Sequence, residues 1–168
     1  MKSKLYRLLC LCAVLAGVLL ISSCAGSGTN DGTKEETTAK KELTFSAIAD
    51  AVNGAVTFEE ALEEIEADVA DMLYGCGEYT SDVRAYCCGS GALAEELVIF
   101  KAKSSEAAGN IIETMKGYRD MSLNRFTTYN PPEVPKLRDA VIIKAGDFVV
   151  YCVSPDAPAV LSALEKLN

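Results

Sequence analysis

The segment DAVIIKAGDFVVYCV, residues 139–153, contains two short apolar runs, Asp139 to Lys144 and Phe148 to Val153. Runs of this length that are rich in Val, Ile and Tyr are typical of β-strands. Ala145-Gly146-Asp147 is short enough to join them as a hairpin. Apolar side chains occupy both alternating positions of the second run, which predicts a strand that is buried on both faces.

A second hairpin is predicted upstream of this one. Val83 to Cys88 and Glu96 to Ala102 have the length and composition of strands, and Gly89-Ser90-Gly91 marks the connection between them. The second strand, like Phe148 to Val153, is apolar at consecutive positions rather than at every other one. In a sheet with one solvent-exposed face, apolar and polar residues alternate along each strand. We therefore expect helices to cover both faces of this sheet, rather than one face to remain an apolar patch for a partner.

A helical pattern follows each hairpin. Ser104 or Ser105 can cap a long helix that runs to about Thr127. A last helix is expected to begin with Ser154 as its N-cap and Pro155 at its first position. Between the long helix and the next strand, prolines predict a segment without regular structure: Asn130-Pro131-Pro132 and Pro135.

Two more helices are predicted ahead of the first hairpin. Apolar residues between Phe45 and Val56 indicate a short helix that is interrupted near Gly54. The next helix is expected to begin at the capping box Thr57-Phe58-Glu59-Glu60 and to end at Gly75. Its apolar stripe is Phe58, Leu62, Ile65, Val69 and Met72. The sequence therefore predicts an α+β domain with an antiparallel sheet of about four strands, built from two hairpins each followed by a helix, and two N-terminal helices.

The N-terminal region is expected to be an export signal and a tether. Basic residues precede an apolar run from Leu8 to Ile21, which at about 1.5 Å per residue is too short to cross the roughly 30 Å hydrocarbon core of a membrane. Residues 1–23 are therefore interpreted as a signal peptide. Residues 24–41 are polar and rich in Gly, Thr, Lys and Glu, which predicts a flexible linker, and residues 42–168 are expected to form a single α+β domain.

The apolar run ends in Ile21-Ser22-Ser23-Cys24, which resembles the lipobox of bacterial lipoproteins. The resemblance implies that a diacylglycerol is attached to the Cys24 sulfur and that signal peptidase II cuts before it. Two acyl chains anchor a protein stably to a membrane, whereas a single chain gives only marginal binding. The expected location is the extracytoplasmic face of the cell membrane.

Composition excludes several classes of chemistry. The chain has no histidine, so Ser-His-Asp and Cys-His nucleophiles and histidine metal sites are absent. Its net charge is −8, and no Lys/Arg-rich cluster offsets it, so a nucleic acid is not an expected partner. No catalytic residue, metal site or cofactor is predicted, and the acidic residues after Thr57 are expected to form a solvated face.

Four cysteines remain after Cys24: Cys76, Cys87, Cys88 and Cys152. In an exported chain they are either buried free thiols or contribute to a structural disulfide, and Cys87 or Cys88 could pair with Cys152 across the sheet. Neither the Cys-x-x-Cys motif of redox enzymes nor the spacing of a zinc knuckle is present.

One group of polar residues is a candidate ligand patch. Tyr118, Arg119, Arg125 and Tyr129 lie near the end of the long helix and could line a pocket for an anionic ligand. The alternative is ordinary packing beside a solvated helix face.

Several short motifs, in order and spacing, resemble the uncharacterised lipoproteins grouped as domain of unknown function 4358. They are Leu73-Tyr74-Gly75, Val98-Ile99-Phe100-Lys101-Ala102, Asp139-Ala140-Val141-Ile142-Ile143-Lys144, Gly146-Asp147-Phe148-Val149 and Val153-Ser154-Pro155-Asp156. The resemblance implies a lipid-anchored domain outside the membrane of a Gram-positive cell, and it supplies no catalytic residues. We expect a non-enzymatic module that binds an envelope protein or a wall component. The alternatives are a small-molecule receptor or carrier and a hydrolase that uses only carboxylates.

Overall fold

The computed structural model describes residues 43–167, and all of them belong to one compact unit. The predicted signal peptide, Cys24 and the linker lie outside the described residues. In chain order the elements are α1 (Phe45–Ala55), β1 (Leu62–Ile65), α2 (Ala67–Tyr74), β2 (Thr80–Cys88), β3 (Glu96–Ala102), α3 (Ser105–Tyr129), the 3-10 helix η1 (Pro131–Glu133), α4 (Val134–Arg138), β4 (Val141–Ala145), β5 (Phe148–Val153) and α5 (Ala157–Glu165).

The strands form one antiparallel sheet of five in the order β1-β2-β3-β5-β4. Both predicted hairpins are confirmed, because β2 pairs with β3 and β4 pairs with β5. In the turn between β4 and β5, Gly146 has φ of 58°, a left-handed conformation that favours glycine. β5 lies between β3 and β4, so α3 carries the chain from the centre of the sheet to its edge.

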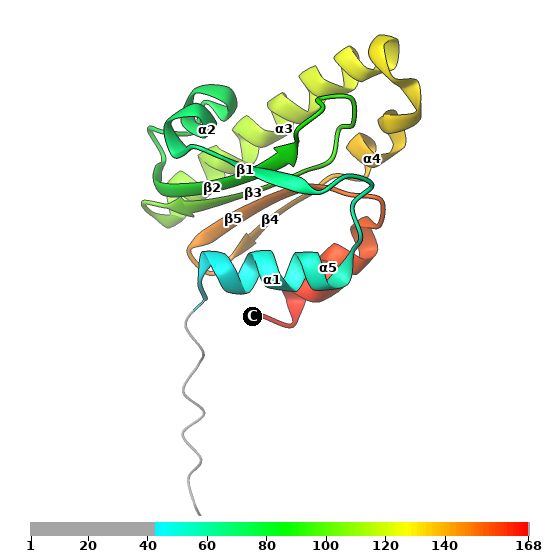
Figure 1. The fold of residues 1–168 in the computed structure, drawn as a ribbon. Coiled ribbons are helices and arrows are strands. Elements are labelled where there is room, and N and C mark those ends of the chain that lie inside the picture. Colours follow the sequence, from blue (N-terminus) through cyan, green and yellow to red (C-terminus); the bar gives the residue numbers. More distant parts are fainter. Residues whose placement is uncertain (1–42, 168) are drawn as a thin grey trace, which may run out of the picture. The chain divides into compact units, whose positions relative to one another are not determined.

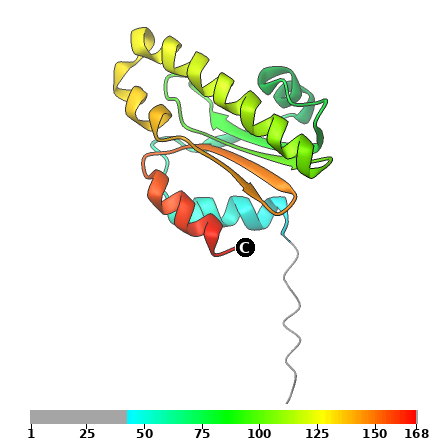
Figure 2. The ribbon, with the colours of Figure 1, turned by 180° about the vertical axis from the view of Figure 1, so that it is seen from behind.

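Helices cover both faces of the sheet, as Figures 1 and 2 show from opposite sides. α1 and α5 lie on one face, where Ile48 and Val160 pack with Val150 of β5. α2 and α3 lie on the other face, where Ile111 packs with Phe100 of β3. Neighbouring residues of a strand point to opposite faces, so the continuous apolar runs of β3 and β5 supply both cores. The expectation that both faces are covered is confirmed, and one N-terminal helix lies on each face.

The predicted second N-terminal helix is wrong in its first half. Residues Leu62–Ile65 form β1, which pairs with the edge of β2, and the helix begins only at Ala67. It ends at Gly75 as predicted, but Met72 of the expected apolar stripe is 82% exposed. Pairing as a strand gives hydrogen-bond partners to an edge of β2 that would otherwise be open, and this outweighs the helical periodicity.

Three smaller predictions also need correction. The proline-rich segment is helical, because its prolines lie in the first turns of η1 and α4, where a missing N–H costs little. α5 begins after Asp156 rather than after Ser154, and Asp156 Oδ1 accepts a hydrogen bond from the Ala159 N–H at 3.0 Å. α1 continues through Gly54 without interruption. The long helix α3 is confirmed, with Ser104 as its N-cap, and none of the helices in residues 43–167 is long and apolar enough to cross a membrane.

Candidate functional site

A pocket of about 390 Å³ opens between α2, α3 and the start of β3. The end of β2, the loop between β2 and β3, and α4 complete its wall. The lining combines apolar side chains with three charged residues, Glu95, Glu96 and Arg125. Small-molecule sites in proteins have volumes of about 300–1,000 Å³ and a similar mixture of apolar and polar groups, so this pocket is the candidate site.

Glu96, the first residue of β3, is the buried acid of the pocket. The residue is 7% exposed, and its Oε2 accepts hydrogen bonds from the hydroxyls of Tyr74 at 2.8 Å and Tyr118 at 3.4 Å. Burial raises the pKa of Glu96 to about 7, although the hydrogen bonds from the two tyrosines and the nearby charge of Arg125 act in the opposite direction. Glu96 forms no ion pair with any Lys or Arg of the described chain. The carboxyl therefore titrates near neutral pH and lacks a positive partner.

Three tyrosines surround this carboxyl. The Tyr118 ring contacts the Tyr74 ring edge to face at 5.0 Å and the Tyr151 ring at 5.9 Å between centroids. Burial, followed by the negative charge of Glu96, raises the pKa of all three phenols, so they remain neutral donors. The Tyr151 hydroxyl is fully buried and makes no hydrogen bond within residues 43–167. The acid is thus held by neutral hydroxyl groups and aromatic rings.

One face of α3 forms a wall of the pocket. Tyr118, Ser122, Arg125 and Tyr129 follow one another at intervals of three or four residues, which places them on the same side of the helix. The Arg125 guanidinium lies 5.2 Å from the centre of the Phe126 ring, and it has no carboxylate partner among the described residues. The structure therefore brings Tyr118, Arg125 and Tyr129 of the candidate patch together at one pocket. Arg119 is not part of the lining and pairs with its neighbour Asp120 at 2.8 Å.

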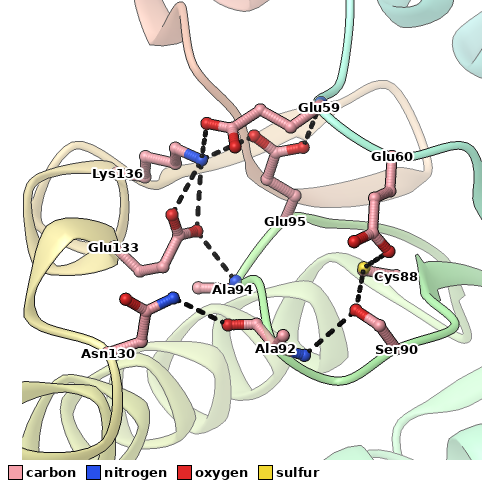
Figure 3. Close-up of polar contacts among 10 residues, drawn as sticks. All are labelled: Glu59, Glu60, Cys88, Ser90, Ala92, Ala94, Glu95, Asn130, Glu133 and Lys136. Atoms are coloured by element: carbon pink, nitrogen blue, oxygen red, sulfur yellow. Dashed lines mark hydrogen bonds and ion pairs between the residues drawn. The ribbon is translucent and has the colours of Figure 1, made fainter.

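A cluster of three carboxylates around Lys136 supports the loop side of the pocket (Figure 3). The Lys136 Nζ lies 2.6 Å from Oε1 of Glu59, 2.8 Å from Oε1 of Glu95 and 3.0 Å from Oε1 of Glu133. The side chains of Glu95 and Glu133 are 0% and 4% exposed. Burial alone would lower the pKa of Lys136, but hydrogen bonds to the three carboxylates outweigh it and raise the pKa.

The same carboxylates hold the backbone of two loops. Oε2 of Glu95 accepts from the Glu59 N–H at 2.8 Å, and Oε2 of Glu133 accepts from the Ala94 N–H at 3.0 Å. The cluster thereby joins the segment before β1, the loop before β3 and the η1–α4 segment. Within residues 43–167 no group of His, Cys, Asp or Glu side chains is arranged to hold a metal ion. We interpret the Lys136 cluster as the support that shapes the pocket wall.

The cysteines Cys76, Cys87, Cys88 and Cys152 are free thiols in the structure. Cys88 donates to Glu60 with a distance of 2.7 Å from Sγ to Oε2 (Figure 3), and this hydrogen bond lowers the pKa of Glu60. Strand β3 lies between β2, which carries Cys87 and Cys88, and β5, which carries Cys152. Two strand spacings amount to about 10 Å, whereas disulfide-bonded Cα atoms lie about 4.4–6.8 Å apart. The predicted bridge across the sheet would need the strands to rearrange.

Glu96 and Lys136 are the site residues that sequence reasoning missed. Glu95-Glu96 precedes an apolar strand and looks like its solvated end, and Lys136 falls in a segment predicted to be irregular. The one available signal was that Glu96 begins a strand apolar on both faces, because an acid in such a strand needs partners.

Glu95 and Glu96 are adjacent acids on the same pocket, but they do not form a catalytic pair. Glu95 is bound to Lys136 and to a backbone N–H, whereas Glu96 is bound to tyrosines. Carboxylate hydrolases need two acidic groups that both face the substrate, one as acid and one as nucleophile or base. Only Glu96 is free to meet a ligand through its carboxyl.

Comparison with known proteins identifies the family of the chain. No curated protein and no solved structure matches the chain. A family model matches residues 55–154, which extend from the end of α1 to just beyond β5 and so include the pocket. With more than half of its length matched, the chain belongs to the family described as domain of unknown function 4358.

Proposed function

We propose that this protein is a lipid-anchored binding module of the cell envelope, and that its domain receives a small ligand in the Glu96 pocket on the outer side of the membrane. The observation that carries the proposal is one pocket of about 390 Å³ that is lined by a buried acid without an ion-pair partner and by an arginine without a carboxylate partner among the described residues. A carboxyl that is buried without an ion-pair partner is costly to ionise in an empty domain, and the exposed guanidinium of Arg125 is open to a ligand at the same pocket.

Binding is favoured over catalysis by the roles of the acidic residues. Glu95 and Glu133 are occupied by Lys136, and the chain has no histidine to act as a base or nucleophile partner. Glu96 could donate or accept a proton near neutral pH, but the groups that bind its carboxyl are tyrosine hydroxyls whose pKa values are raised, and no second carboxyl is free beside it for a two-carboxylate mechanism. A receptor or carrier needs only the charges and the apolar walls.

The membrane anchor rests on Ile21-Ser22-Ser23-Cys24 and on the signal-like segment before it. The full-length protein should be expressed in a Gram-positive host and labelled with an alkyne-bearing fatty acid. We expect the label on the chain, loss of the label in Cys24→Ala, and full labelling in the matched control Cys12→Ala. A mature N-terminal peptide with an unmodified Cys24 in mass spectrometry would contradict the anchor.

Ligand binding can be tested with the mature chain, residues 24–168, carrying Cys24→Ser. A small-molecule fraction dialysed from the host culture should shift the backbone amide resonances of Glu96, Tyr118 and Arg125. The turn at Gly146, which is not part of the pocket lining, serves as the internal reference. Fractions that leave all pocket resonances unchanged, or that shift only residues elsewhere, would refute the binding role.

A further inference from the structure

The charges of the pocket point to a more specific class of ligand, provided that the pocket is the binding site proposed above. We propose that the pocket binds a zwitterionic α-amino acid, whose ammonium group meets Glu96, whose carboxylate meets Arg125 and whose apolar side chain packs against the aromatic and leucine side chains of the walls.

The acid end of the site comes from Glu96. The hydroxyls of Tyr74 and Tyr118 both bind Oε2 of this carboxyl, and Glu96 lines the pocket. Those donors are neutral, and no Lys or Arg of residues 43–167 pairs with the carboxylate. An ammonium group would pair with this carboxylate directly, in the part of the pocket that Tyr74 and Tyr118 also line.

The cationic end comes from Arg125, which lies on the pocket side of α3. Arg125 and Glu96 line the same pocket, yet the two do not form an ion pair. A ligand that carries both charges can bridge them, and a planar guanidinium binds a carboxylate through two parallel hydrogen bonds. A zwitterion can therefore pair with both Glu96 and Arg125, whereas a ligand with a single charge can pair with only one of them.

Size and polarity of the remaining lining agree with a single apolar side chain. The volume of about 390 Å³ lies near the lower end of the range for small-molecule sites, about 300–1,000 Å³. Phe126 and Leu137 are buried in the lining, and Leu73 and Tyr129 at the pocket are 48% and 63% exposed. These side chains offer apolar contact at the mouth as well as within the pocket.

Two matched sets of probes test this assignment by calorimetry with the mature Cys24→Ser chain at about pH 8.5, where Glu96 is ionised. The first set is phenylalanine, 2-phenylethylamine and 3-phenylpropionate. The second is leucine, 3-methylbutylamine and 4-methylpentanoate, and both amino acids are used in L and D forms. Within each set the apolar part is common and only the charged groups differ. We expect an amino acid to bind at least about tenfold more tightly than either singly charged analogue, because each lost charge-assisted hydrogen bond weakens binding by about that factor or more.

Three variants connect the charges to the residues. Glu96→Gln should reduce the affinity of the amino acid to that of the acid analogue, and Arg125→Met should reduce it to that of the amine. Arg119→Met is the matched control, because Arg119 lies on the same helix outside the pocket lining, and it should leave the affinity unchanged.

The outcomes separate this inference from the proposed function. An amine or acid analogue that binds as tightly as the amino acid would overturn the zwitterion assignment, and so would equal affinities in the wild type and in Arg125→Met. If no amino acid binds while a dialysed fraction still shifts the pocket resonances, the ligand class is wrong and the binding role stands. If no probe binds and no dialysed fraction shifts the pocket resonances, both the zwitterion assignment and the proposed binding function are refuted.

Discussion

Replacing Glu96 by glutamine should stabilise the domain above neutral pH and change its stability little in acid. In the native state burial raises the pKa of Glu96 from 4.5 to about 7. Between these two values the native carboxyl keeps its proton while the unfolded one has lost it. The unfolded state therefore binds fewer protons, and the free energy of unfolding falls as the pH rises through this window.

The size of the effect follows from the two pKa values. At about 1.4 kcal/mol per pH unit, a rise from 4.5 to about 7 corresponds to about 3 kcal/mol of lost stability above pH 7. Glutamine has nearly the same shape, keeps an oxygen that accepts from Tyr74, and carries no charge. We expect Glu96→Gln to gain about 3 kcal/mol over wild type at about pH 8 and almost nothing at about pH 4.

Urea unfolding of both proteins across this pH range measures the difference. With slopes of about 1–3 kcal/mol per molar urea, the midpoint of Glu96→Gln should exceed that of wild type by about 1–3 M at alkaline pH. Other carboxylates titrate in both proteins and cancel in the comparison, and Glu78→Gln, at an exposed acid, is the control. A stability difference that does not vary with pH would refute the assignment of a buried, titrating Glu96.

Three further outcomes follow from the structure. Lys136→Met should destabilise the domain by about 3–5 kcal/mol in urea unfolding, because the buried carboxylates of Glu95 and Glu133 lose the cation that they share. The control is Lys116→Met at an exposed ion pair, which should cost less than about 1 kcal/mol. A similarly small loss for Lys136→Met would contradict the stabilising role of the Lys136 cluster. Gly146→Val should cost about 1–2 kcal/mol because φ at this position is 58°, and an unchanged midpoint would mean that the turn adopts another conformation. In the mature Cys24→Ser chain, a thiol reagent should modify Cys87 first, because Cys87 is half-buried whereas Cys76, Cys88 and Cys152 are buried. Denaturation without reductant should then release all four thiols, and a smaller count would reveal a disulfide.

Hairpins and the long helix were predictable from local sequence because their signals are local. The run before Ala145-Gly146-Asp147 and the run after it have strand composition, and the turn needs a residue that tolerates a positive φ. β1 was not predictable in the same way. Leu62–Ile65 fits a helical stripe, and only the open edge of β2 favours its pairing as a strand.

At the site, helical spacing was enough to place Tyr118, Arg125 and Tyr129 on one wall. Arg119 lies off this stripe, because neighbouring helix positions differ by about 100° around the axis, and it was included only because it is close to the others in sequence. Lys136 was missed because its partners Glu59 and Glu95 are far away in sequence.

The two hairpins, the long helix α3, the turn glycine Gly146 and the apolar runs that supply two cores follow from the amino-acid sequence, because they depend on residues within a few positions of one another. Only the tertiary structure determined that the pKa of Glu96 is raised to about 7 and that three carboxylates share the ammonium group of Lys136. The charge state of a carboxyl depends on which atoms replace water around it. Here those atoms come from α2, α3 and β5, which meet only when the sheet is assembled.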